Sequence, residues 1–168
     1  MRNVACLLAL CFLVLPTGAS GTETLFLQVA DLKDGRVYYS LPVRPEITFS
    51  IEFLHSYDRL PCWDLYQVSV DGTLIYRRTG GRSLLNGQGF FYEGFRILPG
   101  GTWEIDGINE TRESILFFMG SKGDADHRLI MSGRTIKLSE KIDAGRIVKV
   151  SIHSTSTNKR KVNAHGME

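Results

Sequence analysis

Apolar side chains alternate with polar ones along most of the chain, and this spacing is typical of β-strands rather than helices. Successive side chains of a strand point to opposite faces, so an apolar residue at every second position marks one buried face. The alternation is clearest in four runs, at residues 25–29, 37–43, 49–55 and 66–70. It predicts further strands at 102–106, 114–119, 127–131, 135–138 and 146–152. No stretch after residue 20 carries a clean apolar stripe at helical spacing over ten residues or more.

Turn-forming residue pairs separate these runs. They are Asp34-Gly35, Asp71-Gly72, Asp106-Gly107 and Ser132-Gly133. Tight hairpin turns need backbone conformations that glycine adopts without steric cost. Short strands divided by frequent turns predict one all-β domain, an antiparallel β-sandwich or barrel of roughly eight to ten strands. We place this domain at residues 21–155.

A glycine-rich segment interrupts the alternation between Thr79 and Gly101, where seven glycines occur. A connection of this length is often functional when it is ordered. Glycine also lets backbone N–H groups approach an anionic ligand closely, which makes Gly87 and Gly89 candidate ligand contacts. The alternative is a mobile loop with a short strand near residues 90–97.

The first twenty residues have the layout of a secretory signal peptide. Arg2 is followed by an apolar run over residues 4–15, then by Pro16 and small residues, so cleavage is expected near Ala19 or Ser20. The apolar run has about twelve residues, whereas a membrane-spanning helix needs roughly 20. We therefore expect an exported protein, periplasmic or otherwise extracytoplasmic, with no membrane span after cleavage. An uncleaved anchor is the alternative.

Cysteine content and charge narrow the class of protein. Cys6 and Cys11 lie in the predicted leader, so Cys62 alone would remain in the exported chain. A disulfide-stabilised domain would carry an even number of cysteines, so we expect a hydrophobic core and a buried Cys62. The net charge of +2 gives no support to nucleic acid or anionic lipid as a partner. Residues 156–168 are polar and basic, and they predict a disordered tail.

Candidate chemistry is concentrated in the stretch FLHSYDRLPCWD, residues 53–64. His55 has the same strand parity as Phe49, and Asp64 has the same parity as Val70. A hairpin closed by residues 56–63 would place Phe49 opposite Val70 and His55 opposite Asp64. Cross-strand partners share a face, so the pattern predicts a His55–Asp64 pair on the inward face at the end of the sheet.

This predicted pair has more than one interpretation. It could be a polar pair that fixes the hairpin register, a ligand site, or a catalytic dyad of a hydrolase. Ser56 points to the opposite face by parity and lacks the Gly-x-Ser-x-Gly context of a nucleophile, so we predict no catalytic residue. Metal binding by His55, Asp58, Asp64 and His127 lacks the clustered spacing of metal sites, and no metal or cofactor is predicted. The candidate binding residues are His55, Ser56, Asp58, Asp64, Gly87 and Gly89.

The longer stretch FLHSYDRLPCWDLYQV resembles the signature of a small bacterial family catalogued as domain of unknown function 1850. In that family a strand ends in His-Ser, an acidic residue, a proline and a second acidic residue follow, and a Gly-x-Gly comes after a later strand. The similarity covers roughly residues 24–152. This chain differs in having Asp at both acidic positions, Tyr57 in place of a small aliphatic residue, and a longer glycine-rich insert. The matching positions are His55, Ser56, Asp58, Pro61, Asp64, Gly87 and Gly89.

The resemblance implies a role in transport rather than a reaction. No activity is assigned to the family, and its genes often lie beside those of tripartite ATP-independent periplasmic transporters of the immunogenic-protein subtype. The expected function is an exported, non-catalytic binding or accessory module. Its expected partners are a transporter or solute-receptor protein and a small polar or anionic solute. The alternatives are a hydrolase that uses His55 and Asp64, and a purely structural protein-interaction domain.

Overall fold

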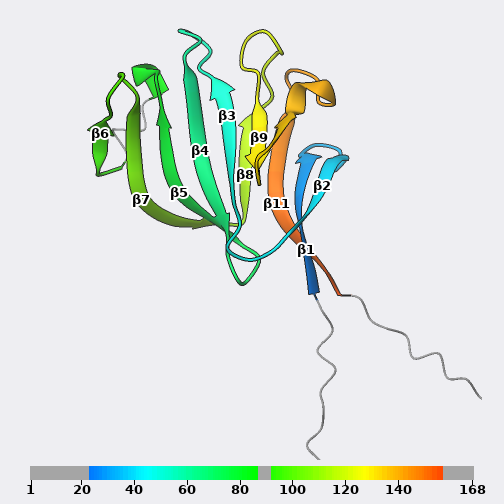
Figure 1. The fold of residues 1–168 in the computed structure, drawn as a ribbon. Helices are drawn as coiled ribbons and strands as arrows, with labels where there is room; N and C mark the ends of the chain where they lie inside the picture. Colours follow the sequence, from blue (N-terminus) through cyan, green and yellow to red (C-terminus); the bar gives the residue numbers. More distant parts are fainter. Residues whose placement is uncertain (1–22, 87–91, 157–168) are drawn as a thin grey trace, which may run out of the picture.

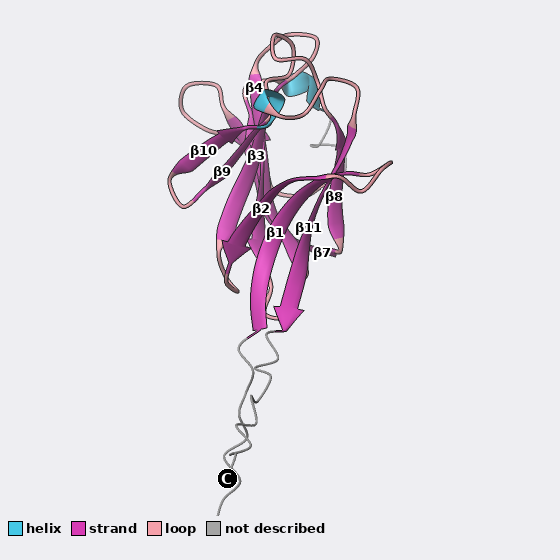
Figure 2. Cartoon of the chain, turned by 90° about the vertical axis from the view of Figure 1, so that its right-hand side faces the viewer, coloured by secondary structure: helices cyan, strands magenta, loops and turns pink. Residues whose placement is uncertain are grey.

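Two antiparallel β-sheets pack against each other in the computed structural model, which describes residues 23–86 and 92–156 (Figure 1, Figure 2). The smaller sheet has four strands, in the order β2 (Val37–Val43), β1 (Glu23–Asp31), β11 (Ile147–Ser156) and β8 (Ser114–Phe118). The larger sheet has seven, in the order β10 (Arg134–Lys137), β9 (Arg128–Met131), β3 (Thr48–Leu54), β4 (Pro61–Val68), β5 (Leu74–Gly81), β7 (Trp103–Arg112) and β6 (Phe95–Ile97). Two short 3-10 helices, η1 (Leu84–Asn86) and η3 (Leu138–Glu140), lie in the connections.

The inward-facing residues of both sheets form one hydrophobic core. Alternation along each strand sends every second side chain into the space between the sheets, as the sequence pattern predicts. Removing such side chains from water is the main force that holds the sheets together, at about 1.5–3 kcal/mol for each fully buried Val, Leu, Ile or Phe. The most deeply buried residues include Leu27 and Val29 of β1, Val148 and Val150 of β11, Phe49 and Ile51 of β3, and Tyr66 and Val68 of β4.

The predicted fold class is confirmed as an antiparallel β-sandwich, and the described residues form eleven strands rather than eight to ten. One strand, β5, was missed because its sequence LIYRRTGG alternates only at its start. Three of the four predicted turn pairs connect consecutive strands. The fourth, Asp106-Gly107, lies inside β7, where the pairing with β5 shifts between Tyr76 and Arg78. Gly107 has a φ of 76° there, so its conformational freedom serves a β-bulge and not a hairpin turn.

The glycine-rich segment is partly strand. Gly80 and Gly81 belong to β5, and a Cβ atom on Gly80 would collide with the indole ring of Trp63 on β4. These two glycines are therefore explained by close packing between strands. A short strand, β6, lies at residues 95–97, near the position that the loop interpretation gave it. Gly87 and Gly89 lie outside the described residues, as do the predicted leader and residues 157–168 of the predicted tail.

Between β7 and β8 the chain passes from the larger sheet to the smaller across a single residue. β7 ends at Arg112 and β8 begins at Ser114, so only Glu113 separates them. β8 is also the edge strand of the smaller sheet. Arg112 and the first residues of β8 therefore lie at the seam where the four-stranded layer ends and the wider layer continues. Within the described residues, we find no helix with the length and apolar character to cross a membrane.

Candidate functional site

The predicted pairing of His55 with Asp64 is wrong. In the hairpin of β3 and β4, Phe49 lies opposite Tyr66 and not Val70, and Asp64 lies opposite Ile51. The partner strand is thus displaced by four residues, an even number, so each apolar set stays on the inward face. The cause is a tighter turn than expected. The His55 N–H donates to the Leu60 carbonyl at 2.9 Å, and the Arg59 N–H donates to the His55 carbonyl at 2.9 Å.

His55 and Asp58 come together in this turn. His55 Nδ1 and Asp58 Oδ1 are 3.3 Å apart, but Nδ1 is buried and its geometry makes no hydrogen bond to any described residue. Asp58 accepts hydrogen bonds from the Leu60 N–H at 3.1 Å and from the Ser83 hydroxyl at 2.7 Å. Burial acts to raise the pKa of Asp58, yet these two bonds and the neighbouring histidine outweigh it and leave the pKa below its usual value. The Asp58 carboxylate therefore ties the turn to the segment after β5.

The remaining predicted residues separate from this pair. Ser56 is exposed at the tip of the turn, away from Asp64, which points between the sheets. The start of the glycine-rich segment does lie beside His55, since Ser83 contacts Asp58 and the Arg82 N–H donates to the Pro61 carbonyl at 2.8 Å. Gly87 and Gly89 cannot be placed, because they lie outside the described residues. Across the described chain, no three His, Cys, Asp or Glu side chains gather closely enough to hold a metal ion.

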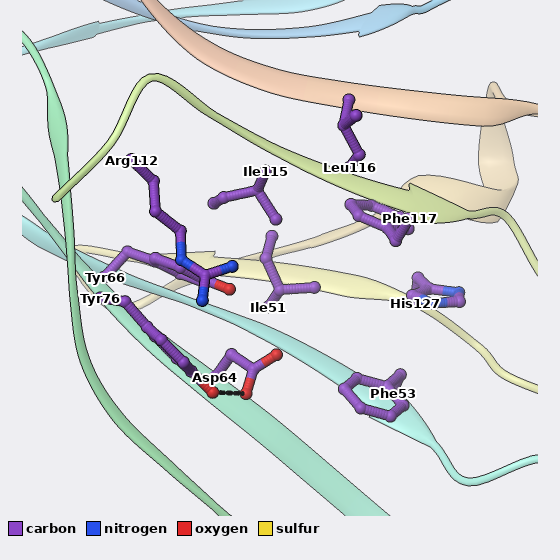
Figure 3. Close-up of a pocket in the computed structure, with 10 residues that line it drawn as sticks. All are labelled: Ile51, Phe53, Asp64, Tyr66, Tyr76, Arg112, Ile115, Leu116, Phe117 and His127. Atoms are coloured by element: carbon purple, nitrogen blue, oxygen red, sulfur yellow. Dashed lines mark hydrogen bonds between the residues drawn. The ribbon is translucent and has the colours of Figure 1, made fainter. Parts of the chain in front are cut away.

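Asp64 instead lines a cavity of about 270 Å³ between the two sheets (Figure 3). Its polar wall comes from β4, β5 and the end of β7, and consists of Asp64, Tyr66, Tyr76 and Arg112. Its apolar wall comes from β3, β8 and the residue before β9, and consists of Ile51, Phe53, Ile115, Leu116, Phe117 and the ring of His127. The cavity thus has a polar end and an aromatic end at the seam between the sheets.

The Asp64 carboxyl is the most unusual group in this pocket. The Tyr76 hydroxyl donates a hydrogen bond to Oδ1 at 2.7 Å, and Figure 3 shows the other oxygen turned toward the cavity. Burial raises the pKa of Asp64, and the hydrogen bond from Tyr76, the neighbouring Thr79 hydroxyl and the charge of Arg112 offset this only in part. Asp64 forms no ion pair with another described residue. An ionised carboxylate at this position would therefore be stabilised by a ligand that supplies a positive charge.

Arg112 brings a positive charge to the same end of the pocket. Its guanidinium lies over the Tyr76 ring, 4.8 Å from the ring centre, in a cation–π contact. One terminal nitrogen, Nη2, donates to Glu110 at 2.6 Å and to the Tyr92 hydroxyl at 3.2 Å. The other two nitrogens, Nε and Nη1, donate to no described residue. The side chain is thus fixed by its neighbours while two of its nitrogens keep unused N–H donors.

His127 forms part of the aromatic end. Its ring stacks between Phe53 and Phe117, with ring centres 5.8 and 4.8 Å away. The Gly120 N–H approaches Nδ1 at 3.5 Å, which assigns the acceptor role to this nitrogen. Burial lowers the pKa of His127 to about 4, against the opposing effect of Asp126. The ring is therefore neutral at pH 7 and contributes a flat surface rather than a charge.

Cys62 is buried as expected, at 1% exposure, and forms no disulfide. Burial raises the pKa of its thiol to about 11, so the thiolate is scarce at neutral pH. Because the thiolate is the reactive form, this cysteine is a packing residue and not a nucleophile.

Of the four polar groups in the pocket, sequence reasoning named only Asp64 as a binding residue and placed Tyr66 only in a predicted strand. Tyr76 belongs to the strand that was not predicted, and Arg112 follows the bulge of β7, which hides its strand parity. His127 was considered only as a metal ligand. The useful signal was Asp64 itself, because an aspartate in the inward register of a strand needs a reason to be there.

Comparison with known proteins gave no match to a family model, to a curated protein or to a solved structure.

Proposed function

We propose that the protein is an exported, non-catalytic binding module that holds a small polar solute in the pocket between its two sheets. The observation that carries the proposal is the half-buried Asp64 carboxyl, which has one oxygen bonded to Tyr76 and the other turned into an open cavity. A polar group removed from water is costly unless it is hydrogen-bonded. In a purely structural site we would therefore expect protein groups to donate to both carboxyl oxygens. A ligand that donates to the second oxygen of Asp64 would explain why this oxygen faces the cavity.

The composition of the pocket supports binding over hydrolysis. None of the described residues that line it is a serine, threonine, cysteine or lysine, so no side-chain nucleophile of these types faces the cavity. His127 is neutral, with its ring held between Phe53 and Phe117, and a pKa of about 4 suits a general base poorly near pH 7. The alternative hydrolase also required His55 beside Asp64, and the register separates them.

The cellular part of the proposal is a periplasmic or otherwise extracytoplasmic location and an association with a solute transporter. It is supported by the signal-peptide layout of residues 1–20 and by the resemblance of residues 53–68 to domain of unknown function 1850. Inspection of the neighbouring genes tests the association. If no transporter or solute-receptor gene lies beside this one, the proposed association with transport is refuted. Ligand binding in the pocket is then tested separately.

A thermal-shift screen of small polar solutes tests binding. A solute that binds only the folded protein raises its unfolding midpoint, and the stabilisation grows with the logarithm of ligand concentration over Kd. The pocket variant is Phe53→Trp, which enlarges a side chain that lines the cavity, and the control is Phe118→Trp, on a residue 71% exposed and outside the lining. The shift should vanish in Phe53→Trp and persist in Phe118→Trp. Equal shifts in both variants would place the ligand elsewhere.

The turn around His55 is a second candidate location for the ligand. The buried and unbonded Nδ1 of His55 favours it, as does the nearby start of the glycine-rich segment. His55→Ala distinguishes the two locations. Loss of the thermal shift in His55→Ala, with a native circular dichroism spectrum and with Phe53→Trp still binding, would move the site to this turn.

A further inference from the structure

The two charged groups of the pocket, Asp64 and Arg112, face the same cavity without pairing with each other. The Arg112 guanidinium contacts Glu110, Tyr92 and the Tyr76 ring, and the Asp64 carboxyl contacts the Tyr76 hydroxyl. Figure 3 shows both side chains at the same end of the pocket, with Tyr66 and Tyr76 beside them. Because both side chains line the cavity and form no ion pair with each other, each charge can contact a ligand held there.

A ligand with one charge would fit this arrangement badly. A simple cation that pairs with Asp64 would be repelled by Arg112, and a simple anion that pairs with Arg112 would be repelled by Asp64. These interactions are strong in a partly enclosed site, because the effective dielectric there is well below that of water. A molecule with both charges gives each of the two groups an opposite charge to contact.

We infer that the pocket takes a small zwitterion of the amino-acid class, with its ammonium group at Asp64 and its carboxylate at the Arg112 guanidinium. This inference rests on the proposed binding function and names its ligand class. Nε and Nη1 of Arg112 lie on different edges of the guanidinium, and each can donate one charge-assisted hydrogen bond to a carboxylate oxygen of the ligand. The outward oxygen of Asp64 accepts from the ammonium, while the Tyr76 hydroxyl holds the other oxygen.

The rest of the pocket selects the side chain of the ligand. Phe53, Phe117 and the neutral ring of His127 offer flat apolar surfaces at the end away from Arg112. A cavity of about 270 Å³ is smaller than the pockets that hold drug-sized molecules, which begin at about 300 Å³. An amino acid with an aliphatic or aromatic side chain matches both the size and the lining.

Isothermal titration calorimetry on the mature protein at pH 7 tests the inference. The probes are the twenty standard amino acids and two truncated forms of leucine. One truncated form, 3-methylbutylamine, lacks the carboxylate, and the other, 4-methylpentanoate, lacks the ammonium. At least one apolar amino acid should bind. If that amino acid is leucine, each truncated form should bind at least tenfold more weakly, and for another amino acid the corresponding amine and acid are used.

Charge variants then assign each end of the ligand. Asp64→Asn should weaken amino-acid binding at least tenfold and leave binding of the acid analogue unchanged or improved, because the repelling carboxylate is gone. Arg112→Gln should weaken amino-acid binding equally and spare the amine analogue. The controls are Asp143→Asn and Arg44→Gln, both on exposed residues outside the pocket, which should bind as the unmodified protein does. Circular dichroism confirms that each variant is folded.

The outcomes separate this inference from the proposed function. If no amino acid binds, or if the amine or acid analogue binds as well as the amino acid, the zwitterion assignment is overturned. The proposed function survives that result whenever another solute gives a thermal shift that Phe53→Trp abolishes. It fails when no solute in the wider screen does so.

Discussion

The burial of His127 makes a specific prediction about stability in acid. The side chain is 7% exposed, its ring lies between two phenylalanines, and burial lowers its pKa from 6.5 to about 4. Between these two values the unfolded chain binds a proton that the folded protein does not. The free energy of unfolding therefore falls as the pH drops through this interval, and the contribution is fully present above the unfolded pKa. Protonation of His127 in the unfolded chain lowers the free energy of unfolding by about 2–3 kcal/mol between pH 7 and pH 4.5. This follows from about 1.4 kcal/mol for each unit of pKa difference between the folded and unfolded states.

The substitution His127→Gln isolates this contribution. Glutamine is uncharged at both pH values and keeps an acceptor for the Gly120 N–H, although it loses the stacking on Phe53 and Phe117. The variant should be less stable than the unmodified protein at pH 7, because ring packing is lost. Between pH 7 and pH 4.5 the free energy of unfolding of the variant should nevertheless fall by about 2–3 kcal/mol less than that of the unmodified protein. Only the unmodified protein has a buried imidazole at this position that must stay unprotonated in the folded state.

Urea denaturation at the two pH values measures the difference. Carboxylates also titrate in this range, but they do so in both proteins, and the comparison cancels their effect. The control is His153→Gln on an exposed residue of β11, which should retain the acid-sensitive component that His127 supplies. If His127→Gln and the unmodified protein lose stability in parallel, the ring is not desolvated and the aromatic end of the pocket is more open than the structure indicates. A histidine resonance that titrates near pH 4 in nuclear magnetic resonance would support the assignment directly.

Three further predictions concern packing, reactivity and processing. Gly80→Ala should destabilise by about 1–3 kcal/mol in chemical denaturation, because the new methyl group collides with the indole of the adjacent strand; Gly123→Ala, with open space around it, should change little. Cys62 should resist alkylation by iodoacetamide in the native protein and react after denaturation, since it is 1% exposed and its pKa is raised to about 11; rapid native labelling would contradict its burial. The exported protein should have an intact mass that begins near Gly21 and includes no acyl chain; a mass that retains residues 1–20 would refute cleavage.

The fold could be predicted because alternation is a local property of the sequence. The alternation within residues 25–29, or within residues 49–53, predicts a strand with one buried face without any information from the rest of the chain. Strands that depart from strict alternation were predicted less well. β5 has two arginines in its middle, and β7 contains a bulge at Gly107 that resembles a turn.

The register could not be predicted by the same reasoning. Phe49 can pair with Tyr66, as observed, or with Val70, as predicted, and both registers place the same apolar side chains of β3 and β4 inward. The hydrophobic pattern therefore does not distinguish two registers that differ by four residues. The choice depends on the turn, where the His55 N–H bonds to Leu60 and Asp58 accepts from Leu60 and Ser83. The bond from Ser83 comes from a segment distant in sequence, and no local pattern contains it.

The shift in register changes the environment of Asp64 completely. The predicted register would have paired it with His55 on the inward face at the end of the sheet. Opposite Ile51 it lies between the sheets with a tyrosine hydroxyl as its hydrogen-bond donor. A protein under selection for stability alone would be expected to replace such a carboxyl with an apolar side chain, since an apolar group of similar size removes the cost of desolvation. The retained acid, the Arg112 nitrogens that donate to no described residue and the cavity that both side chains line support the proposal of one binding site.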